Sequence, residues 1–290
     1  MNRPRARVHE GGKQSFMLAE ERRFRIREIL STRRTISASE LCSLLDVTPA
    51  TIRRDLAALE QEGVLVRSHG GAVSRMSSTK FQPSYETLAR SNSEEKQAIA
   101  REAEKLILDG DTVFLEGSTT VVELAGRLHN RNRLTVVTNS PTIVGQLQHS
   151  AGVTVLCTGG DLQKDTVYFS GEWAQRALSE IRLDKAVLGV SAIDPGYGIS
   201  TANHAEAQIK KMIVRAAKTR IALADHTKFG KQSFAYVGPV DEINVLVTDA
   251  ATDTKYISDL RESGLEVIVA PMEQPNSSGR RNRSHVIKNG

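Results

Sequence analysis

Cysteine and long apolar runs are scarce in this sequence, and each shortage excludes a class of protein. The 290 residues include two cysteines, Cys42 and Cys157, with no CxxC pair and no Cys/His cluster. Neither a disulfide framework nor a structural zinc site is therefore expected, which fits a reducing, cytoplasmic compartment. No apolar stretch approaches the ~18 residues that a membrane span requires, and the basic N-terminus has no apolar core of a secretory signal.

Charge is distributed unevenly along the chain. The net charge is +5, made up of +5 over residues 1–75, −4 over residues 76–275 and +4 over residues 276–290. A basic head and a mildly acidic body suggest that a polyanion meets the head. The alternative is an ordinary solvated basic surface. A hydrophobic content of 39% is sufficient for a buried core.

The head carries three amphipathic helical patterns joined by short turns. The second pattern follows Ser37, and Glu40 stands three residues on, which is the capping-box spacing. The third follows Thr48, a helix-capping residue, and has Pro49 at its first position, where the missing N–H costs nothing. This order of helices and turns predicts a helix-turn-helix.

The third helix has an apolar side and a small-residue side. At 100° per residue, Ile52, Leu56 and Leu59 fall together and predict the buried face. Small residues with projecting arginines can enter the major groove of DNA, where Arg bonds a guanine edge or a phosphate. The alternative is a solvated surface helix. The candidate DNA contacts on this helix are Thr48, Ala50, Thr51, Arg53 and Arg54.

A predicted wing follows this helix. The string "EGVLVRSHGGAV" offers two short strands and a turn, with Arg67 and His69 near the tip as further DNA contacts. An ordinary turn at Gly70-Gly71 is the alternative. Because caps, turn length, apolar triad and wing agree, we favour a winged helix-turn-helix domain that binds duplex DNA.

The body alternates short apolar, β-branched runs with helical patterns. This alternation is typical of an α/β domain with a mostly parallel sheet covered on both faces. The preceding polar stretch, which contains Pro83, is typical of a linker. The predicted organisation is a disordered basic N-terminus, the winged helix-turn-helix domain, a linker, the α/β domain and a disordered basic tail, over residues 1–16, 17–74, 75–91, 92–272 and 273–290.

Polar loops follow several predicted strands of the body. They are Gly117 to Thr120, Thr138 to Ser140, and Thr158 to Gly160. In open parallel sheets ligands bind at the carboxyl ends of the strands, and backbone N–H groups at a helix start bind anions. The loops therefore predict a site for a small polar ligand, although Ser and Thr at a helix start are often only caps. The first loop is neither a P-loop nor a GxGxxG fingerprint, so no cofactor is expected.

Two long segments resemble a known family. "ERRFRIREIL…ISASELCSLLDVTPATIRRDLAALEQEGVLVRSHGGAV" is similar to the DNA-binding head of the DeoR family of bacterial transcriptional regulators. "EEKQAIAREA", "GDTVFLEGSTT", "VVTNS", "TGGDL", "AEAQIKKMI", "LADHTKFG" and "VTD" match the family's effector domain in order, so the resemblance runs from about Leu18 to Ala270. It implies a Rossmann-like domain similar to sugar-phosphate isomerases. Where the family usually has Ser, Asp, Gly and Gly, this chain has Thr48, Glu116, Ser118 and Ala192.

The resemblance also implies an effector pocket for a phosphorylated sugar. Lys210 and Lys228 would supply positive charge, although each is otherwise an ordinary solvated lysine. Carried over by motif, the pocket residues are Glu116, Gly117, Ser118, Thr119, Thr120, Thr138, Asn139, Ser140, Gly159, Gly160, Lys210, Asp225 and Lys228.

The implied function is that of a cytoplasmic DNA-binding transcriptional regulator, a repressor of a sugar-catabolism operon. Its partners would be an operator DNA, a phosphorylated sugar and further copies of itself in a dimer or tetramer, with no metal and no membrane. The alternative is an active sugar-phosphate isomerase or deaminase with an accessory DNA-binding head. No spacing in the sequence selects a pair of residues for general acid–base catalysis, so we do not expect an enzyme. The candidates, which are chosen by residue type only, are Glu116, Asp225, Glu206, His204 and His226.

Overall fold

The chain divides into two compact units, Met1–Phe81 and Gln82–Gly290. The computed structural model describes residues 17–33, 35–62, 64–68, 70–74, 83–164 and 166–272. The ends predicted to be disordered, residues 1–16 and 273–290, lie outside this part, as do residues 75–82 of the predicted linker. No helix within the described ranges is long and apolar enough to cross a membrane.

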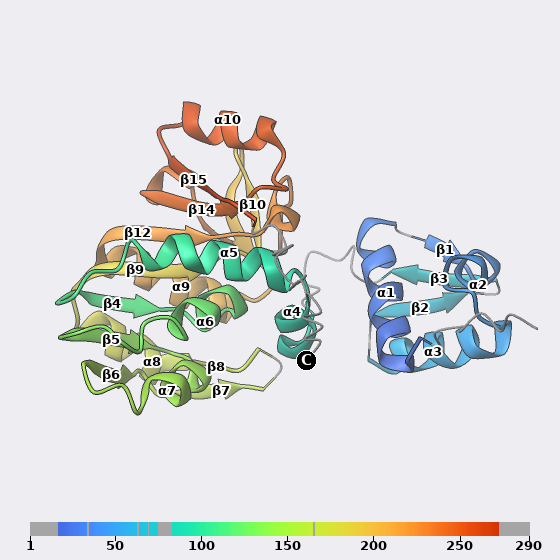
Figure 1. The fold of residues 1–290 in the computed structure, drawn as a ribbon, viewed down its shortest axis with the longest axis horizontal. Helices are drawn as coiled ribbons and strands as arrows, with labels where there is room; N and C mark the ends of the chain where they lie inside the picture. Colours follow the sequence, from blue (N-terminus) through green and yellow to red (C-terminus); the bar gives the residue numbers. More distant parts are fainter. Residues whose placement is uncertain are drawn as a thin grey trace, which may run out of the picture. The chain divides into compact units, whose positions relative to one another are not determined.

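The first unit combines three helices with a small antiparallel sheet of order β1-β3-β2 (Figure 1). This is the predicted helix-turn-helix with a wing. Its elements in chain order are α1 (Ala19–Thr32), β1 (Thr35–Ser37), α2 (Ala38–Leu45), α3 (Pro49–Gln61), β2 (Leu65–Ser68) and β3 (Gly71–Ser74).

Side-chain caps define the turn between α2 and α3. The Ser37 hydroxyl accepts the Glu40 backbone N–H at 3.1 Å, and the Thr48 hydroxyl accepts the Thr51 N–H at 3.3 Å. Asp46, at the end of α2, adopts a left-handed conformation with φ of 50°. Both predicted caps are confirmed, and they fix where α3 begins.

An ion pair that we did not anticipate joins α1 to α3. Asp55 is 4% exposed although it is charged. Arg22 Nε donates to Asp55 Oδ2 at 2.7 Å, Arg22 Nη2 donates to Oδ1 at 3.3 Å, and Arg22 Nη1 donates to the Met17 carbonyl at 2.7 Å. A bidentate arginine–carboxylate pair fixes orientation as well as distance. The pair therefore sets which side of α3 faces inward.

The second unit is an α/β fold built on a seven-stranded sheet. Its helices are α4 (Tyr85–Arg90), α5 (Ser93–Glu104), α6 (Thr119–Ala125), α7 (Pro141–Leu147), α8 (Gly171–Ser179), α9 (His204–Ala216), α10 (Thr254–Glu262) and the 3₁₀ turns η1 (His226–Lys228) and η2 (Val240–Glu242). Its strands are β4 (Thr112–Leu115), β5 (Leu134–Thr138), β6 (Val153–Cys157), β7 (Asp161–Gln163), β8 (Tyr168–Ser170), β9 (Leu183–Gly189), β10 (Ala192–Asp194), β11 (Gly198–Thr201), β12 (Ala217–Leu223), β13 (Ala235–Gly238), β14 (Val245–Asp249) and β15 (Glu266–Ala270).

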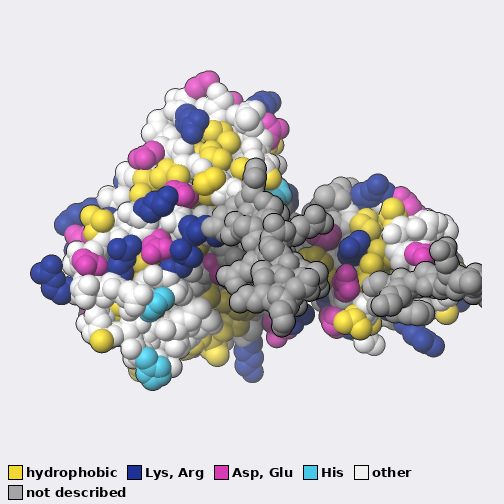
Figure 2. Space-filling view, viewed as in Figure 1, with side chains coloured by type: hydrophobic (Ala, Val, Ile, Leu, Met, Phe, Trp, Pro, Cys, Tyr) yellow, Lys and Arg dark blue, Asp and Glu magenta, His cyan; other side chains and the backbone are white. Residues whose placement is uncertain are grey.

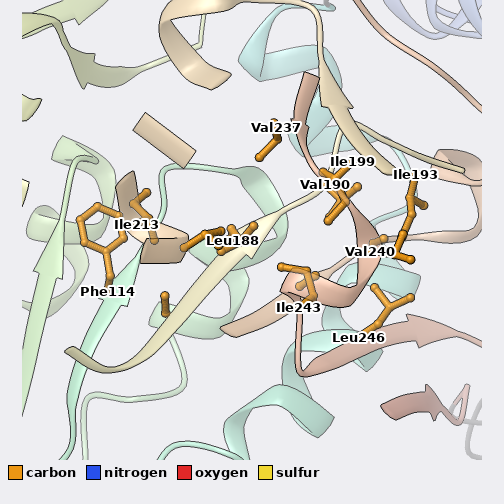
Figure 3. Close-up of a cluster of buried hydrophobic side chains, with 14 of the residues drawn as sticks. Phe114, Leu188, Val190, Ile193, Ile199, Ile213, Val237, Val240, Ile243 and Leu246 are labelled. Atoms are coloured by element: carbon orange, nitrogen blue, oxygen red, sulfur yellow. The ribbon is translucent and has the colours of Figure 1, made fainter. Parts of the chain in front are cut away.

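The large sheet is wholly parallel and is covered on both faces. Successive residues of β4 alternate between two apolar cores. Phe114 packs with Leu188 and Ile213 on the side of α8 and α9 (Figure 3). Val113 and Leu115 pack on the other side with apolar residues of α5, α6 and α7. The predicted fold class is thus confirmed.

The strand order places a switch point between β4 and β9. The order is β15-β14-β12-β9-β4-β5-β6, so the chain first builds outward from β4 through β5 to β6 and then returns to the other side of β4. The loops after β4 and β9 therefore diverge to opposite faces and leave a crevice at the carboxyl ends of these strands. This is where a ligand of an open parallel sheet is expected to bind.

The predicted linker is shorter in the structure than its assigned range of 75–91. Residues Tyr85–Arg90 form helix α4, which belongs to the second unit and packs on α6. The Ser84 hydroxyl caps this helix by accepting the Thr87 backbone N–H at 3.4 Å. The polar composition of this stretch gave no sign of the capped helix in the sequence.

Candidate functional site

Helix α3 presents two arginines to solvent. Ile52, Leu56 and Leu59 are at most 2% exposed, which confirms the predicted buried face. Arg53 and Arg54 are exposed, and neither has a hydrogen-bond or ion-pair partner among the described residues. On the face of the second unit seen in Figure 2, Lys and Arg are interspersed with Asp and Glu. The unpaired arginines of α3 are therefore the better candidates for contacts with a polyanion.

The candidate DNA contacts with small side chains lie at the start of the same helix. Thr48 and Ala50 are exposed and Thr51 is half-buried. The Thr48 and Thr51 hydroxyls lie 3.0 Å apart, and the Thr48 hydroxyl caps the helix. The first turn of α3 consequently offers low-profile side chains beside Arg53 and Arg54, as a helix in a groove requires.

The wing arginine has a partner within its own unit. Arg67 Nε donates to Glu60 Oε2 at 2.6 Å, and the Arg67 backbone N–H donates to Glu60 Oε1 at 2.9 Å. These bonds tie β2 to the end of α3. Arg67 must exchange Glu60 for a phosphate if it contacts DNA, whereas Arg53 and Arg54 need no exchange. His69 lies outside the described residues.

At the switch point of the sheet, Lys210 is enclosed by two carboxylates. Its Nζ lies 2.9 Å from Glu116 Oε1 and 3.3 Å from Glu206 Oε1, and it donates to the Gly189 carbonyl at 2.7 Å. All three charged residues are at most 5% exposed. Burial opposes the charge on Lys210, but the two carboxylates outweigh it and raise its pKa above the ordinary value.

The triad bears on the role that the sequence predicts for Lys210, which stays a prediction. Lys210 was expected to supply positive charge for a phosphate, but all three of its donors face Glu116, Glu206 and the Gly189 carbonyl. Two carboxylates and one ammonium leave this end of the site with net negative charge. Lys210 therefore neutralises the protein's own buried carboxylates.

A small cavity lies beside this triad. Its volume is about 40 Å³, roughly the space of one water molecule. Four predicted residues line it, Glu116, Gly117, Ser118 and Thr119, and the Ser118 hydroxyl also caps α6 by accepting the Val121 N–H. The remaining lining residues were not predicted: Tyr85, Leu88, Thr166, Tyr168 and Glu206. Gly189 permits the close approach of β9, since a Cβ there would lie 2.1 Å from Ser118 Oγ.

The second polar loop holds the site together without lining the cavity. Asn139 Oδ1 accepts the Gly117 N–H at 3.0 Å, and Asn139 Nδ2 donates to the Phe169 carbonyl at 3.2 Å. The Thr138 hydroxyl donates to the Leu115 carbonyl at 2.7 Å, and the Ser140 hydroxyl caps α7. Thr120 is likewise buried within α6. These side chains position the loop after β4.

The glycine loop after β6 is also set apart from the cavity lining. Gly159 and Gly160 have positive φ values of 64° and 113°. A Cβ on Gly160 would lie 2.3 Å from the Ser170 carbonyl, so the glycine permits close packing against the start of α8. The observed reason for glycine here is packing and backbone conformation.

A lysine cluster surrounds Asp225 at the end of β12. Asp225 Oδ1 accepts from Asn92 Nδ2 at 3.1 Å and from the Thr227 N–H at 3.0 Å, whereas its buried Oδ2 has no hydrogen-bond partner within the described part of the chain. Lys228 Nζ lies 3.6 Å from Oδ2. Although burial opposes ionisation, Lys228 and the Thr227 hydroxyl hold the pKa of Asp225 below its usual range.

Two further lysines complete this cluster, and the sequence analysis missed both. Burial lowers the pKa of Lys96 to about 8; the Asp225 carboxylate opposes this shift and Lys228 adds to it. Burial also lowers the pKa of Lys231, and Lys228 adds to that shift. Lys96, Lys228 and the exposed Lys231 thus all interact electrostatically with Asp225, and Lys228 is the one that forms an ion pair with it among the described residues. Lys96 had a detectable signal, because it stands on the apolar side of its helix, at spacings of three, four and seven from Ile99, Ala100 and Ala103.

The acid–base candidates do not form one catalytic group. The exposed His204 lies 3.2 Å from Gln208 Nε2. His226 Nδ1 lies 3.1 Å from Asp249 Oδ1, a buried carboxylate that also accepts the His226 N–H through Oδ2. Glu206 belongs to the Lys210 triad. Within the described ranges, no group of His, Cys, Asp and Glu could hold a metal ion.

Comparisons with known proteins agree with this architecture. A family model described as the DeoR-like helix-turn-helix domain matches residues 22–78, and one described as the DeoR C terminal sensor domain matches residues 91–250. The chain is 36% identical over 258 residues to the HTH-type transcriptional repressor GlcR of Bacillus subtilis (strain 168), covering 89% of this chain and 99% of that one. It is 32% identical over 250 residues to the putative aga operon transcriptional repressor of Escherichia coli O157:H7, covering 86% and 93%.

Solved structures give a weaker likeness. Ribose 5-phosphate isomerase A from Methanocaldococcus jannaschii matches with a TM-score of 0.36 and 19% identity, over 48% of this chain and 55% of that one. A likeness at this level carries no argument about function.

The winged head, the parallel α/β unit and the curated relatives define a DNA-binding transcriptional regulator with a C-terminal sensor domain, and not an enzyme. The chain belongs to the DeoR family, as its motifs predicted.

Replacement of Lys210 tests whether it neutralises buried charge. Lys210→Met leaves Glu116 and Glu206 uncompensated, so we expect the free energy of unfolding to fall by about 3–5 kcal/mol. Urea unfolding followed by circular dichroism measures the loss. Lys105→Met removes an exposed lysine that pairs with Glu102 and serves as a control, with an expected change below about 0.5 kcal/mol. Equal stability of the two variants would show that Lys210 has no such role.

Proposed function

We propose that this regulator represses a sugar-related operon and releases its operator when a phosphorylated sugar binds the second unit. The observation that carries the proposal is the separation of charge: a lysine cluster and a carboxylate-lined cavity lie at the carboxyl edge of one parallel sheet. The names of two relatives support this proposal. One is the putative aga operon repressor, and another is the glycerol-3-phosphate regulon repressor of Escherichia coli (strain K12), 29% identical over 223 residues, covering 77% of this chain and 88% of that one.

In this proposal α3 is the recognition helix. Its exposed side combines Arg53 and Arg54 with small side chains in the first turn, which suits insertion into the major groove. A single winged head offers few base contacts. We therefore propose at least a dimer that binds two half-sites, and we place the protein in the cytoplasm where the DNA is.

The phosphate of the effector would bind toward the lysine cluster. Lys96, Lys228 and Lys231 against Asp225 leave a net charge of about +2, whereas the Lys210 triad is net negative. Lys96 Nζ donates to the Leu88 carbonyl, and Leu88 lines the cavity together with Ser118 and Thr119. Leu88 thus connects the lysine cluster to the lining of the cavity. Charge-assisted hydrogen bonds to phosphate are roughly twice as strong as neutral ones.

Helix α4 is the proposed route of the signal. A sugar phosphate is larger than the ~40 Å³ of the cavity, and Tyr85 and Leu88 of α4 form part of its wall, so we propose that binding displaces α4. Lys96 Nζ also donates to the Ser91 carbonyl at 2.6 Å, just beyond α4. Because α4 follows directly on residues 75–84, its displacement would change the chain segment that leads to the head.

The DNA contact is tested with a double variant. We expect Arg53→Ala/Arg54→Ala to abolish specific operator binding, and Arg54→Ala alone to cost about 1–3 kcal/mol if it contacts a base edge. A phosphate contact would instead weaken all sequences alike and reduce the salt slope by about 1. Fluorescence anisotropy with operator and scrambled duplexes at several salt concentrations distinguishes the cases. Unchanged operator affinity of the double variant would reject α3 as the recognition helix.

The effector response is tested at Lys228. Lys228→Ala should bind operator normally but no longer release it when sugar phosphates are added, because the phosphate loses a charged partner. A thermal-shift screen of triose, pentose and hexose phosphates on the unaltered protein identifies the ligand, and anisotropy then measures the release. Lys218→Ala is the matched control, since Lys218 is exposed and pairs with Asp184. Release of Lys228→Ala at unchanged ligand concentration would show that the site lies elsewhere.

The lowered pKa of Lys96 predicts that the affinity for the effector depends on pH. Its pKa of about 8 means that it is charged at pH 7 and loses its proton as the pH rises through about 8. If the ammonium binds the phosphate, affinity falls above pH 8 by at most about tenfold per pH unit, and the bound anion moves the fall to somewhat higher pH. Lys96→Arg remains charged and should flatten the profile. Isothermal titration calorimetry from pH 7 to pH 9.5 measures the effector affinity of the unaltered protein and of Lys96→Arg. Identical dependence of the two affinities on pH would contradict a role for Lys96.

A further inference from the structure

The wall of the cavity beside Lys210 carries two carboxylates. Glu116 and Glu206 both line it, and Lys210 is their shared counter-ion. A phosphate beside this net negative end would be repelled. The hydrogen-bonding groups of this wall therefore fit a different part of the ligand.

Tyr168 is the second feature of this wall. Its side chain is 2% exposed and lines the cavity, and its buried hydroxyl has no hydrogen-bond partner among the described residues. Burial raises its pKa above the ordinary value, and Glu206 and Glu116 add to the rise. Thr166 lies near the Tyr168 hydroxyl and offsets part of this rise in pKa, but the two side chains are not oriented to form a hydrogen bond. A neutral phenol without a partner is costly in a buried site.

The lining defines the chemistry of the missing partner. The carboxylates of Glu116 and Glu206 accept hydrogen bonds only, whereas the hydroxyls of Tyr168, Ser118 and Thr119 donate and accept. A carbonyl could accept from Tyr168 but could give nothing to the carboxylates. A sugar hydroxyl does both, because it donates to a carboxylate and accepts from the phenol. Glu206 lies in the first turn of α9, where the helix dipole favours its negative charge.

We infer that Glu206 and Tyr168 select the effector by the hydroxyl groups of its sugar, which enter the cavity while the phosphate stays at the lysine cluster. This inference rests on the proposed function and adds the orientation and the specificity of the ligand. It also explains why the switch point is negative although the effector is an anion.

The test compares two ligands on two variants of the full chain. Tyr168→Phe removes only the hydroxyl, and Glu206→Gln removes only the charge. The ligands are the sugar phosphate with the largest thermal shift on the unaltered protein and inorganic phosphate. We expect both variants to bind the sugar phosphate about tenfold or more weakly, as the loss of a buried hydrogen bond implies. Inorganic phosphate should bind Tyr168→Phe unchanged, and Glu206→Gln as tightly or more tightly.

Controls separate recognition from folding. Tyr236→Phe removes an exposed phenol on β13 and should leave both affinities unchanged. The melting temperature without ligand shows whether each variant is folded, and Glu206→Asp retains the charge if Glu206→Gln does not fold. A deoxy analogue of the sugar phosphate should bind the unaltered protein weakly and should lose little more on Tyr168→Phe.

The outcomes are distinct. This inference is overturned if Tyr168→Phe and the Glu206 variant bind the sugar phosphate with unchanged affinity. If Lys228→Ala still fails to release the operator in that case, the proposed function stands. Tighter binding of glucosamine 6-phosphate than of glucose 6-phosphate, lost in Glu206→Gln, would show that the carboxylates read an ammonium group and overturns it as well. Failure of every sugar phosphate to bind the unaltered protein rejects the proposed function together with the inference.

Discussion

The arrangement of the second unit depends on one buried ammonium group. Lys210 joins Glu116 at the end of β4, Glu206 on its own helix and the Gly189 carbonyl at the end of β9. Removing such charges from water costs several kcal/mol per ion, which only close pairing offsets. The groups must therefore stay together, and β4, β9 and α9 are held at the point where the strand order reverses. The same pairing leaves this end of the crevice negative, which separates it from the lysine cluster.

The polar residues at the strand ends serve the fold before they serve a ligand. The side chains of Thr138 and Asn139 bond the backbone of Leu115, Gly117 and Phe169. Ser140 caps α7 and Ser118 caps α6. Parallel strands end at one edge, so their loops meet and must satisfy each other's N–H and carbonyl groups. A motif rich in Ser, Thr and Asn thus marks the edge correctly but does not tell which side chains face the cavity.

Local physics made much of the fold predictable. The buried face of α3 follows from the spacing of Ile52, Leu56 and Leu59, and its caps from Thr48 and Ser37, all within a few residues. Helix α4 was missed because it lies in a polar stretch that gives no apolar periodicity. The pairing of Lys210 could not be predicted because its partner Glu116 lies on another element, 94 positions earlier in the chain. Asp55 shows the same limit, since only the distant Arg22 explains its burial. Helical spacing can show that a charged residue stands on the apolar side of its helix, as it does for Lys96, but it does not reveal which distant residue pairs with that charge.

The same contacts make α4 a responsive element. A helix of six residues is too short to persist without tertiary support. Support for its last turn comes from Lys96, which donates to the Leu88 and Ser91 carbonyls, and from Asn92, which binds Asp225. An effector bound as proposed would draw Lys96 or Asp225 into new contacts and remove that support, so the order of α4 and the affinity for the effector would be linked. Linkage of this kind transmits no more free energy than the difference in affinity between the two states, typically ~1–3 kcal/mol. A change of that size in the order of α4 is sufficient to alter operator affinity by about one to two powers of ten.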